Sequence, residues 1–366
     1  MTISTTKKLL GATVVAAVAV ALAGCGQAPT DKPSGTGKPA ASDFMPCIVS
    51  DMGGFDDKSF NQLSFEGATA AAKSLDVKLT QVESNAETDY TPNVESLVSQ
   101  GCTTIVAVGF ALSAATVDAA KANPETDFIL VDDAADNDHD GKADAENVKP
   151  LLYNTAEAAF LAGYLSAGYS KAGKVGTFGG MEFPTVTIFM DGFKQGVDYY
   201  NKENGKSVAV VGWDGKTGSF TGGFEANQEA KSVATNILDQ GVDVIMPVGG
   251  PIYQSALQAI KESNKDVALV GVDADLFETD PSTADHVLTS VLKGMDISTE
   301  EAVKASAEGK FDATPYIGTL ENKGVGLAPL HDYESKVDPA LMTKVDAVKQ
   351  QIIDGKITVT SYLAKK

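Results

Sequence analysis

Residues Cys47-Ile-Val-Ser-Asp-Met-Gly-Gly54 open the first strand–turn–helix unit of this chain of 366 residues. The first five residues predict a short apolar strand that ends in an aspartate, and the glycines after it allow a tight turn. The run from Ser59 to Ser74 that follows predicts a helix. The same alternation continues along the chain, and it is typical of an α/β protein with parallel strands.

The alternation falls into two series, because it restarts after about residue 155. We expect strands at 47–51, 77–82, 104–108, 127–132, 148–153, 174–178, 207–213, 243–248, 267–272 and 286–291. We expect helices at 59–74, 90–100, 112–122, 156–170, 187–201, 223–239, 253–263, 298–308 and 339–353. A folded part of roughly 320 residues also exceeds one comfortable hydrophobic core, which favours two lobes.

The predicted boundaries of these lobes follow from the two series. Lobe 1 is expected at 44–154, with a return segment at about 286–312. Lobe 2 is expected at 155–285, with a C-terminal segment at about 313–366. The strand at 286–291 and the helix at 298–308 should therefore lie in lobe 1.

The N-terminus has the parts of an export signal. Lys7 and Lys8 precede an apolar run that ends at Leu22-Ala-Gly-Cys25, and the run is too short to span a bilayer comfortably. The ending resembles a bacterial lipobox, which implies removal of residues 1–24 and acylation of Cys25. The alternative is an ordinary cleaved signal with an incidental Cys25. Residues 25–43 lack large apolar side chains almost completely and predict a flexible tether.

The composition restricts the partners. A formal net charge of −20 at pH 7 argues against nucleic acid as a partner and against electrostatic adhesion to anionic lipid. No second run approaches the length of a transmembrane helix. We therefore expect the protein to be held on the extracytoplasmic face of the cell membrane by the acyl chains on Cys25.

Export also changes how the other two cysteines are interpreted, since disulfides persist outside the cytosol. Cys47 opens the first predicted strand and Cys102 opens the third. In a doubly wound sheet these strands are neighbours that are entered from the same edge. We predict a disulfide between Cys47 and Cys102, with two buried free thiols as the alternative.

Glycines and polar residues follow most of the predicted strands. They are Asp51, Gly109 and Phe110, Asp132 and Asp133, Gly179 and Gly180, Trp213 and Asp214, Gly249 and Gly250, and Asp273 and Asp275. Open α/β sheets bind ligands at the carboxyl ends of their strands. Any single one of these residues could instead form a turn or cap a helix. As a set that faces one cleft from two lobes, they favour a binding site.

Several segments resemble the basic membrane protein family of ABC-transporter lipoproteins. They are Asp51-Met-Gly-Gly-Phe-Asp-Asp-Lys-Ser-Phe-Asn61, Ala159-Phe-Leu-Ala-Gly163, Gly176-Thr-Phe-Gly-Gly180, Asp191-Gly-Phe-Lys-Gln-Gly196, Gly271-Val-Asp273 and Leu288-Thr-Ser-Val-Leu-Lys293. The resemblance runs from about Cys47 to Asp296. It implies a type I periplasmic-binding fold, with two Rossmann-like lobes joined by a three-segment hinge. It also implies a receptor that binds a purine nucleoside and delivers it to an ABC permease, with no cofactor required.

The resemblance assigns roles to individual residues. Phe60 and Phe220 match aromatic residues that clamp the base from the two lobes, and such stacking tolerates base identity. Asp51 and Asn61 match the residues that contact the edge of the base. Asp132, Asp273 and Lys293 match polar residues around the ribose, with Asp133 as the alternative to Asp132. Gly249 and Gly250 would bring backbone groups against the ligand, and Gly109 and Phe110 lie near the mouth of the site.

One segment resembles the start of a calcium loop. Asp136, Asp138, Asp140 and Asp144 supply oxygens at positions 1, 3, 5 and 9, and Gly141 stands at the sharp turn. Position 12 is Asn147 rather than the expected glutamate. The alternatives are a structural Ca²⁺ site and a solvated acidic turn.

Two other function classes compete with a nucleoside receptor. Nucleoside hydrolases also hold ribose with clustered aspartates, but their cluster follows the first strand, whereas Asp136, Asp138 and Asp140 follow the fourth. The chain has no Walker-type loop and no Cys/His pattern typical of a metal site. The second rival is a receptor of the same fold for a sugar or another small signal, because fold alone does not decide function.

Overall fold

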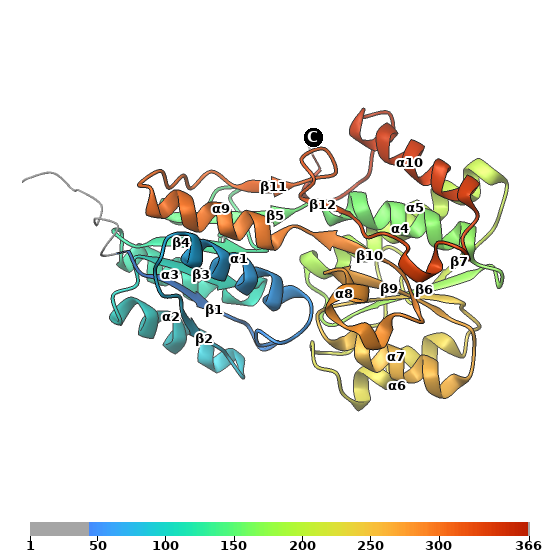
Figure 1. The fold of residues 1–366 in the computed structure, drawn as a ribbon, viewed down its shortest axis with the longest axis horizontal. Coiled ribbons are helices and arrows are strands. Elements are labelled where there is room, and N and C mark those ends of the chain that lie inside the picture. The colour runs from blue at the N-terminus through green and yellow to red at the C-terminus, as the bar shows by residue number, and fades with distance from the viewer. Residues whose placement is uncertain (1–43, 365–366) are drawn as a thin grey trace, which may run out of the picture. The chain divides into compact units, whose positions relative to one another are not determined.

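A computed structural model of the protein describes residues 44–364. The predictions for the signal segment 1–24, for acylation of Cys25 and for the tether 25–43 concern residues outside this range. Figure 1 shows the described chain as two groups of strands and helices, one from blue to teal with part of the orange chain and one from green to red.

The first sheet has six strands that are all parallel. In spatial order they are β11 (Tyr316–Gly318), β5 (Val148–Tyr153), β4 (Asp127–Val131), β3 (Thr104–Val108), β1 (Pro46–Val49) and β2 (Thr80–Val82). The central strands are buried along their whole length, as expected for parallel strands with helices on both faces.

The second sheet repeats this order. Its strands are β12 (Val325–Leu327), β10 (Val287–Lys293), β9 (Ala268–Asp273), β8 (Val244–Val248), β6 (Lys174–Gly179) and β7 (Ala209–Val211). All pairings are parallel except that of β12 with β10. The prediction of two Rossmann-like lobes with parallel sheets is thus confirmed.

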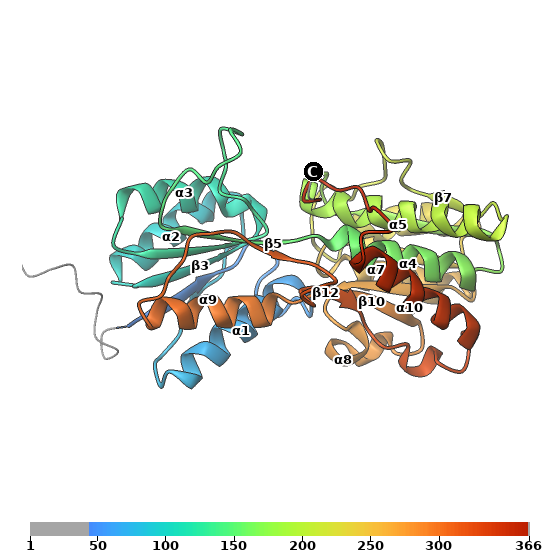
Figure 2. The ribbon, with the colours of Figure 1, turned by 90° about the horizontal axis from the view of Figure 1, so that it is seen from above.

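Helices cover both faces of each sheet. The first sheet lies between the pair α1 (Phe60–Ser74) and α9 (Met295–Ala307) and the pair α2 (Tyr90–Ser99) and α3 (Ser113–Ala122). The second lies between α4 (Thr155–Tyr169) with α5 (Pro184–Asn204) and α6 (Gln228–Leu238) with α7 (Ile252–Ser263). The short α8 (Leu276–Thr279) follows β9, and α10 (Pro339–Ile353) packs on α4. Figure 2 shows α9 alongside α1.

The chain crosses between the sheets three times, which confirms the three-segment hinge. The crossovers are at Asn154, at Gly294 and at residues 319–324. Backbone hydrogen bonds join them, because the N–H of Asn154 donates to the carbonyl of Gly318 (2.8 Å) and the N–H of Gly294 donates to that of Gly324 (2.9 Å).

The prediction for the return segment is wrong in part. The strand at 286–291 was expected in lobe 1, but β10 pairs in parallel with β9 in the second sheet (Figure 1). It occupies the position that β5 occupies in the first sheet, so each sheet completes its fifth strand before the chain crosses. Only α9 returns to lobe 1 as predicted. Within the segment expected in lobe 2, β11 belongs to the first sheet because it pairs with β5.

The structure contains the disulfide between Cys47 and Cys102 that the sequence predicted. Cys47 lies in β1, and Cys102 lies two residues before its neighbour β3. Both cysteines are buried at the amino ends of their strands, opposite the edge to which the strand-end aspartates belong.

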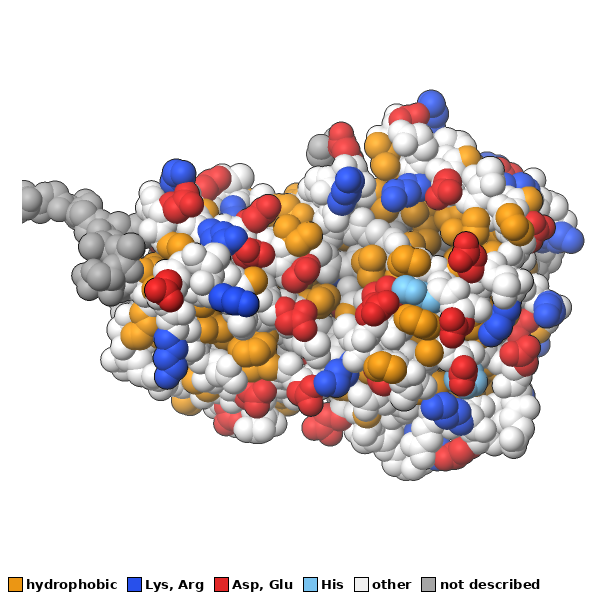
Figure 3. Space-filling view, viewed as in Figure 1, with side chains coloured by type: hydrophobic (Ala, Val, Ile, Leu, Met, Phe, Trp, Pro, Cys, Tyr) orange, Lys and Arg blue, Asp and Glu red, His pale blue; other side chains and the backbone are white. Residues whose placement is uncertain are grey.

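The surface agrees with the expectation of an acidic protein. On the face drawn in Figure 3, lysines lie singly among acidic side chains. Among residues 44–364, no helix has both the length and the apolar character required to cross a membrane.

Candidate functional site

A cavity lies between the carboxyl ends of the strands of both sheets. In the first sheet its walls follow β1, β3 and β4, and in the second they follow β6, β8, β9 and β10. The positions between β1 and β3 and between β6 and β8 are where the strand order reverses, which is where such sheets bind ligands.

Ten of the predicted ligand-binding residues line this cavity. They are Asp51, Phe60, Asn61, Gly109, Phe110, Asp132, Gly249, Gly250, Asp273 and Lys293. They come from strand ends and from the start of α1, which are far apart in the sequence, so the fold brings the predicted set together. Asp133 does not line the cavity, because its carboxylate accepts hydrogen bonds from the Ser113 hydroxyl and from the N–H of Ala135 (2.7 Å).

Phe220 is the predicted residue that does not line the cavity. Its ring lies edge-on to Trp213, with ring centroids 6.1 Å apart, and it packs against Gly179. Phe224, four residues later, lines the cavity instead. A Cβ atom at Gly249 would lie 2.7 Å from the Phe224 ring, so the glycine leaves room for that ring. The assignment of Phe220 as the second clamping ring is therefore corrected to a packing role.

Lys293 forms the charged centre of the cavity. It ends β10, is buried, and pairs with Asp132 of the first sheet and with Asp273 of the second, whose carboxylate lies 3.7 Å from its Nζ. Burial raises the pKa of Asp132 although Lys293 opposes the rise. Burial also raises the pKa of Asp273 to about 6. Buried carboxylates of this kind are ready acceptors for hydroxyl groups of a ligand.

Aromatic rings surround the same ammonium group. Its Nζ lies 5.0 Å from the centroid of Phe60, 5.3 Å from that of Tyr153 and 5.4 Å from that of Phe189. These distances are within the range of cation–π attraction. The cavity thus combines flat apolar faces with a compact charged centre.

A second polar group lies at the start of α1. The carboxylate of Asp51 accepts hydrogen bonds from Asn61 Nδ2 (2.7 Å) and from the N–H of Gly53 (3.1 Å), and burial raises its pKa. Asp57 also lines the cavity, is 3% exposed, and has a pKa that burial raises to about 6. Sequence reasoning missed Asp57, although an aspartate just before a predicted helix, here two residues before Ser59, is a recognisable capping signal.

The two lobes also contact each other directly beside the cavity. The Ser59 hydroxyl donates to the carbonyl of Val272 (3.1 Å), and the Thr279 hydroxyl donates to the carbonyl of Lys58 (2.8 Å). The loop between β1 and α1 therefore rests on the end of β9 and on α8.

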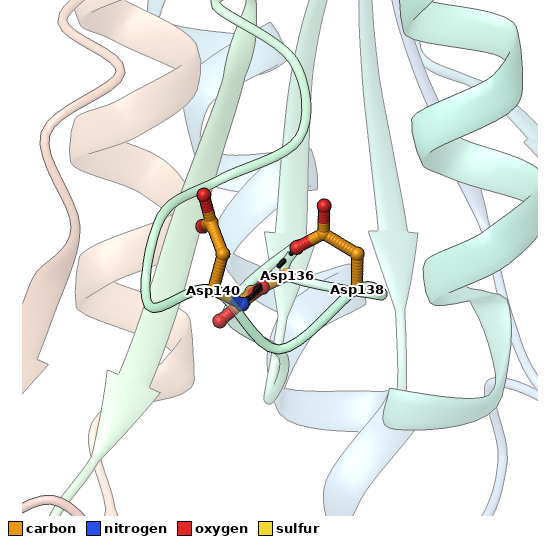
Figure 4. A group of neighbouring side chains, drawn as sticks. All are labelled: Asp136, Asp138 and Asp140. Carbon is orange, nitrogen blue, oxygen red and sulfur yellow. Dashed lines mark hydrogen bonds between the residues drawn. The ribbon is translucent and has the colours of Figure 1, made fainter.

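The acidic loop between β4 and β5 is separate from the cavity. Figure 4 shows Asp136, Asp138 and Asp140 on this loop, with carboxylate oxygens within 4.8 Å of one another. Asp144 is not in this group, and its Oδ2 accepts from the N–H of Asn137 (2.8 Å). Backbone N–H groups of Asp140 and Gly141 donate to Asp136 at 3.0 and 2.9 Å. Calcium binding by this loop stays a prediction.

Comparisons with known proteins show which proteins the chain resembles. A family model described as ABC transporter substrate-binding protein PnrA-like matches residues 46–362. The chain is 30% identical to the ABC transporter nucleoside-binding protein BmpA of Lactococcus lactis subsp. cremoris, over 97% of this chain and 99% of that protein. It is 28% identical to Basic membrane protein A of Borreliella burgdorferi, over 84% and 86% of the two chains.

A solved structure shows the same fold. The ABC transporter system solute-binding protein from Aeropyrum pernix K1 superposes with a TM-score of 0.77 and 25% sequence identity. The match covers 87% of this chain and 94% of that chain. The similarity therefore includes both lobes.

Proposed function

Since the chain belongs to the Bmp family of PnrA-like ABC transporter substrate-binding proteins, we propose that it is a non-catalytic receptor for a purine nucleoside. The ligand would lie in the cavity between the two sheets, and an ABC permease would receive it. The acyl chains on Cys25 would hold the receptor in the bilayer on the extracytoplasmic face.

One observation carries this proposal: the cavity combines aromatic faces with a buried Lys–Asp centre. A nucleoside has the matching halves, because its base is flat and stacks on rings while its ribose carries vicinal hydroxyls. The carboxylates of Asp132 and Asp273 can accept both hydroxyl protons, and Lys293 can donate in return. Each such charge-assisted hydrogen bond contributes about 1.5–3 kcal/mol.

Closure of the lobes would complete the site. The contacts of Ser59 with Val272 and of Thr279 with Lys58 join the lobes beside the cavity. A ligand that touches both lobes favours the closed arrangement, and closure excludes water from the hydrogen bonds to ribose.

The geometry gives no support to the hydrolase alternative. The aspartates that suggested it, Asp136, Asp138 and Asp140, lie on the loop of Figure 4 and are not among the described residues that line the cavity. A sugar receptor of the same fold stays an alternative, and the choice of ligands in the experiment decides between them.

Isothermal titration calorimetry of the full-length protein in detergent tests the proposal. The panel contains purine and pyrimidine nucleosides, free bases, ribose and hexoses. We expect one-to-one binding of nucleosides, weaker binding of free bases and none of hexoses. Binding of sugars alone, or of nothing in the panel, would contradict the nucleoside assignment.

Two phenylalanine variants supply a matched control. Phe60→Leu removes a ring from the cavity, so nucleoside affinity should fall by about 1–3 kcal/mol, the range measured for loss of a stacking ring. Phe220→Leu makes the same chemical change outside the cavity, so affinity should stay near that of the unchanged protein. Equal effects of the two substitutions would argue against base stacking on Phe60.

A further inference from the structure

Asp57 holds the beginning of α1 in place. Its Oδ1 accepts from the N–H groups of Ser59 (2.9 Å) and Gln62 (3.1 Å), and its Oδ2 accepts from the N–H of Asn61 (2.8 Å). The N-cap residue Ser59 makes no capping hydrogen bond with its own side chain. A single buried carboxylate thus satisfies three of the free N–H groups at this helix end.

The same carboxylate also holds the side chain of Asn61. Asn61 Nδ2 donates to Asp57 Oδ2 (3.3 Å) and to Asp51 Oδ1 (2.7 Å). A carboxamide nitrogen has two hydrogens, and both are used here. The opposite orientation of the amide would turn its oxygen toward two carboxylates, so the surrounding acceptors decide which atom lies where.

This orientation leaves the amide oxygen of Asn61 as the free atom. Asn61 is 1% exposed, and within residues 44–364 its Oδ1 has no hydrogen-bond partner. Asn61 lines the cavity together with Asp51, which is also an acceptor. A buried acceptor without a partner is costly, so a ligand that brings a donor is favoured over one that does not.

We propose that Asp57 is a positioning residue that orients the amide of Asn61, so that this end of the cavity selects ligands that present N–H donors. The proposal rests on the proposed function, because it takes the ligand to be a nucleoside. The selected class is then a nucleoside whose base carries a ring N–H or an exocyclic amine. Asp57 acts on this selection through Asn61.

Three nucleosides test the selection by titration calorimetry of the full-length protein in detergent. Inosine carries a ring N–H, adenosine carries an exocyclic amine, and purine riboside has neither donor. We expect purine riboside to bind at least about tenfold more weakly than the better of the other two, because it leaves the acceptor unpaired. Equal affinities would overturn the inference and leave the proposed function intact, whereas binding of none of the three would contradict the proposed function itself.

The variant Asp57→Asn tests the role of Asp57. The oxygen of its new amide can still accept from the N–H groups of Ser59 and Gln62, but its nitrogen would face both nitrogens of Asn61. Only Asp51 would then hold the amide of Asn61, so its orientation is weakened. We expect the affinity ratio between the donor-bearing nucleoside and purine riboside to fall toward one. A role limited to helix stability would weaken binding of all three nucleosides by the same factor and keep the ratio, and that result would overturn the proposal.

Two further variants keep the test decisive. Asp338→Asn is the matched control, because Asp338 caps α10 by accepting from the N–H of Ala340 and does not line the cavity. It should leave the ratio unchanged. Asp57→Ser keeps a hydroxyl acceptor before α1 but removes the second oxygen, which accepts from Asn61. Should both Asp57 variants lose all nucleoside binding, or keep the full ratio, the proposal is wrong.

Discussion

Asp132 and Asp273 occupy equivalent positions at the ends of β4 and β9. Both have a left-handed backbone conformation, with φ of +69° and +68°. Aspartate tolerates this conformation better than most residues, and it turns each carboxylate toward Lys293. Two buried carboxylates then share one ammonium group, so this group carries a net negative charge unless one carboxylate is protonated.

This imbalance predicts a pH dependence of stability that Asp273→Asn should remove. Burial raises the pKa of Asp273 from 3.8 to about 6, so the folded protein holds this proton more tightly than the unfolded chain. The contribution of Asp273 to the free energy of unfolding is therefore complete below pH 4 and is lost as the pH rises through 6. The loss amounts to about 3 kcal/mol, because each unit of pKa shift corresponds to about 1.4 kcal/mol.

Urea denaturation at several pH values measures this effect. Near pH 4, Asp273→Asn and the unchanged protein should have similar free energies of unfolding. Toward pH 7, the free energy of unfolding of the variant should exceed that of the unchanged protein by up to about 3 kcal/mol. A difference between the two proteins that stays constant over this range would contradict the prediction. Nucleoside binding to the variant should be much weaker at pH 7, because a neutral amide replaces the carboxylate.

At the scale of elements, the disulfide and the cavity lie at opposite ends of β1 and β3. The disulfide joins β1 and β3 near their amino ends, whereas the cavity begins where the same strands end. Gly109, directly after β3, has φ of +117°, and a Cβ atom there would lie 2.6 Å from Asp51 Oδ2. A glycine is therefore required for the two strand ends to approach each other.

This separation predicts that loss of the disulfide lowers stability without changing ligand binding. Replacing both Cys47 and Cys102 by alanine should lower the free energy of unfolding by about 2–4 kcal/mol, as for other loops closed by a disulfide. Urea denaturation measures the loss, and calorimetry with a nucleoside should give an unchanged affinity. Identical stability of the two proteins, or a clear loss of affinity in the variant, would be the contrary results.

At the scale of the whole described chain, the three crossovers form one hydrogen-bonded group between the sheets. Asn154 makes three hydrogen bonds here: its backbone N–H donates to Gly318, its Nδ2 donates to Glu157 of α4 (2.8 Å), and its Oδ1 accepts from the Ser361 hydroxyl (2.7 Å). The C-terminal segment therefore contacts the first crossover. A displacement of one crossover should therefore displace the other two.

Glycine at position 324 is predicted to be necessary for this arrangement. A Cβ atom there would lie 2.4 Å from Gly318 Cα and 2.4 Å from Tyr316 Oη. Overpacking of this kind costs about 1–3 kcal/mol, so Gly324→Ala should separate the crossovers and weaken nucleoside binding by about tenfold or more. Gly326→Ala is the control, because no atom lies within 4 Å of its added Cβ.

Titration calorimetry and small-angle X-ray scattering check this prediction together. The Gly324→Ala variant should bind more weakly and should contract less on adding nucleoside than the unchanged protein. The Gly326→Ala variant should match the unchanged protein in both measurements. If the two variants behave alike, the close packing of the crossovers has no influence on the cavity.

Much of the fold and the strand-end residues of the candidate site could be predicted because they depend on local patterns, whereas Phe60, Asn61 and Lys293 were predicted from the family resemblance. Apolar runs between turn residues predicted the buried strands, and the restart of the alternation predicted the second sheet. Parallel strands end at one edge, so residues such as Asp51, Asp132 and Asp273 were expected to meet there. The pairing of Cys47 with Cys102 followed from the same strand order.

The remaining features depend on contacts that no local pattern contains. Val287–Lys293 is apolar enough to pair in either sheet, and only the free edge of β9 decided that it lies in the second. Phe220 and Phe224 lie in the same glycine-rich loop, and the path of that loop past Gly249 decided which ring enters the cavity. The chain by itself thus determined its strands, its two lobes and the sheet edge at which the cavity lies, because burial and turns are local. The tertiary structure alone decided which side chains line the cavity and which contacts Asp57 makes with Asn61, because those depend on packing between distant segments.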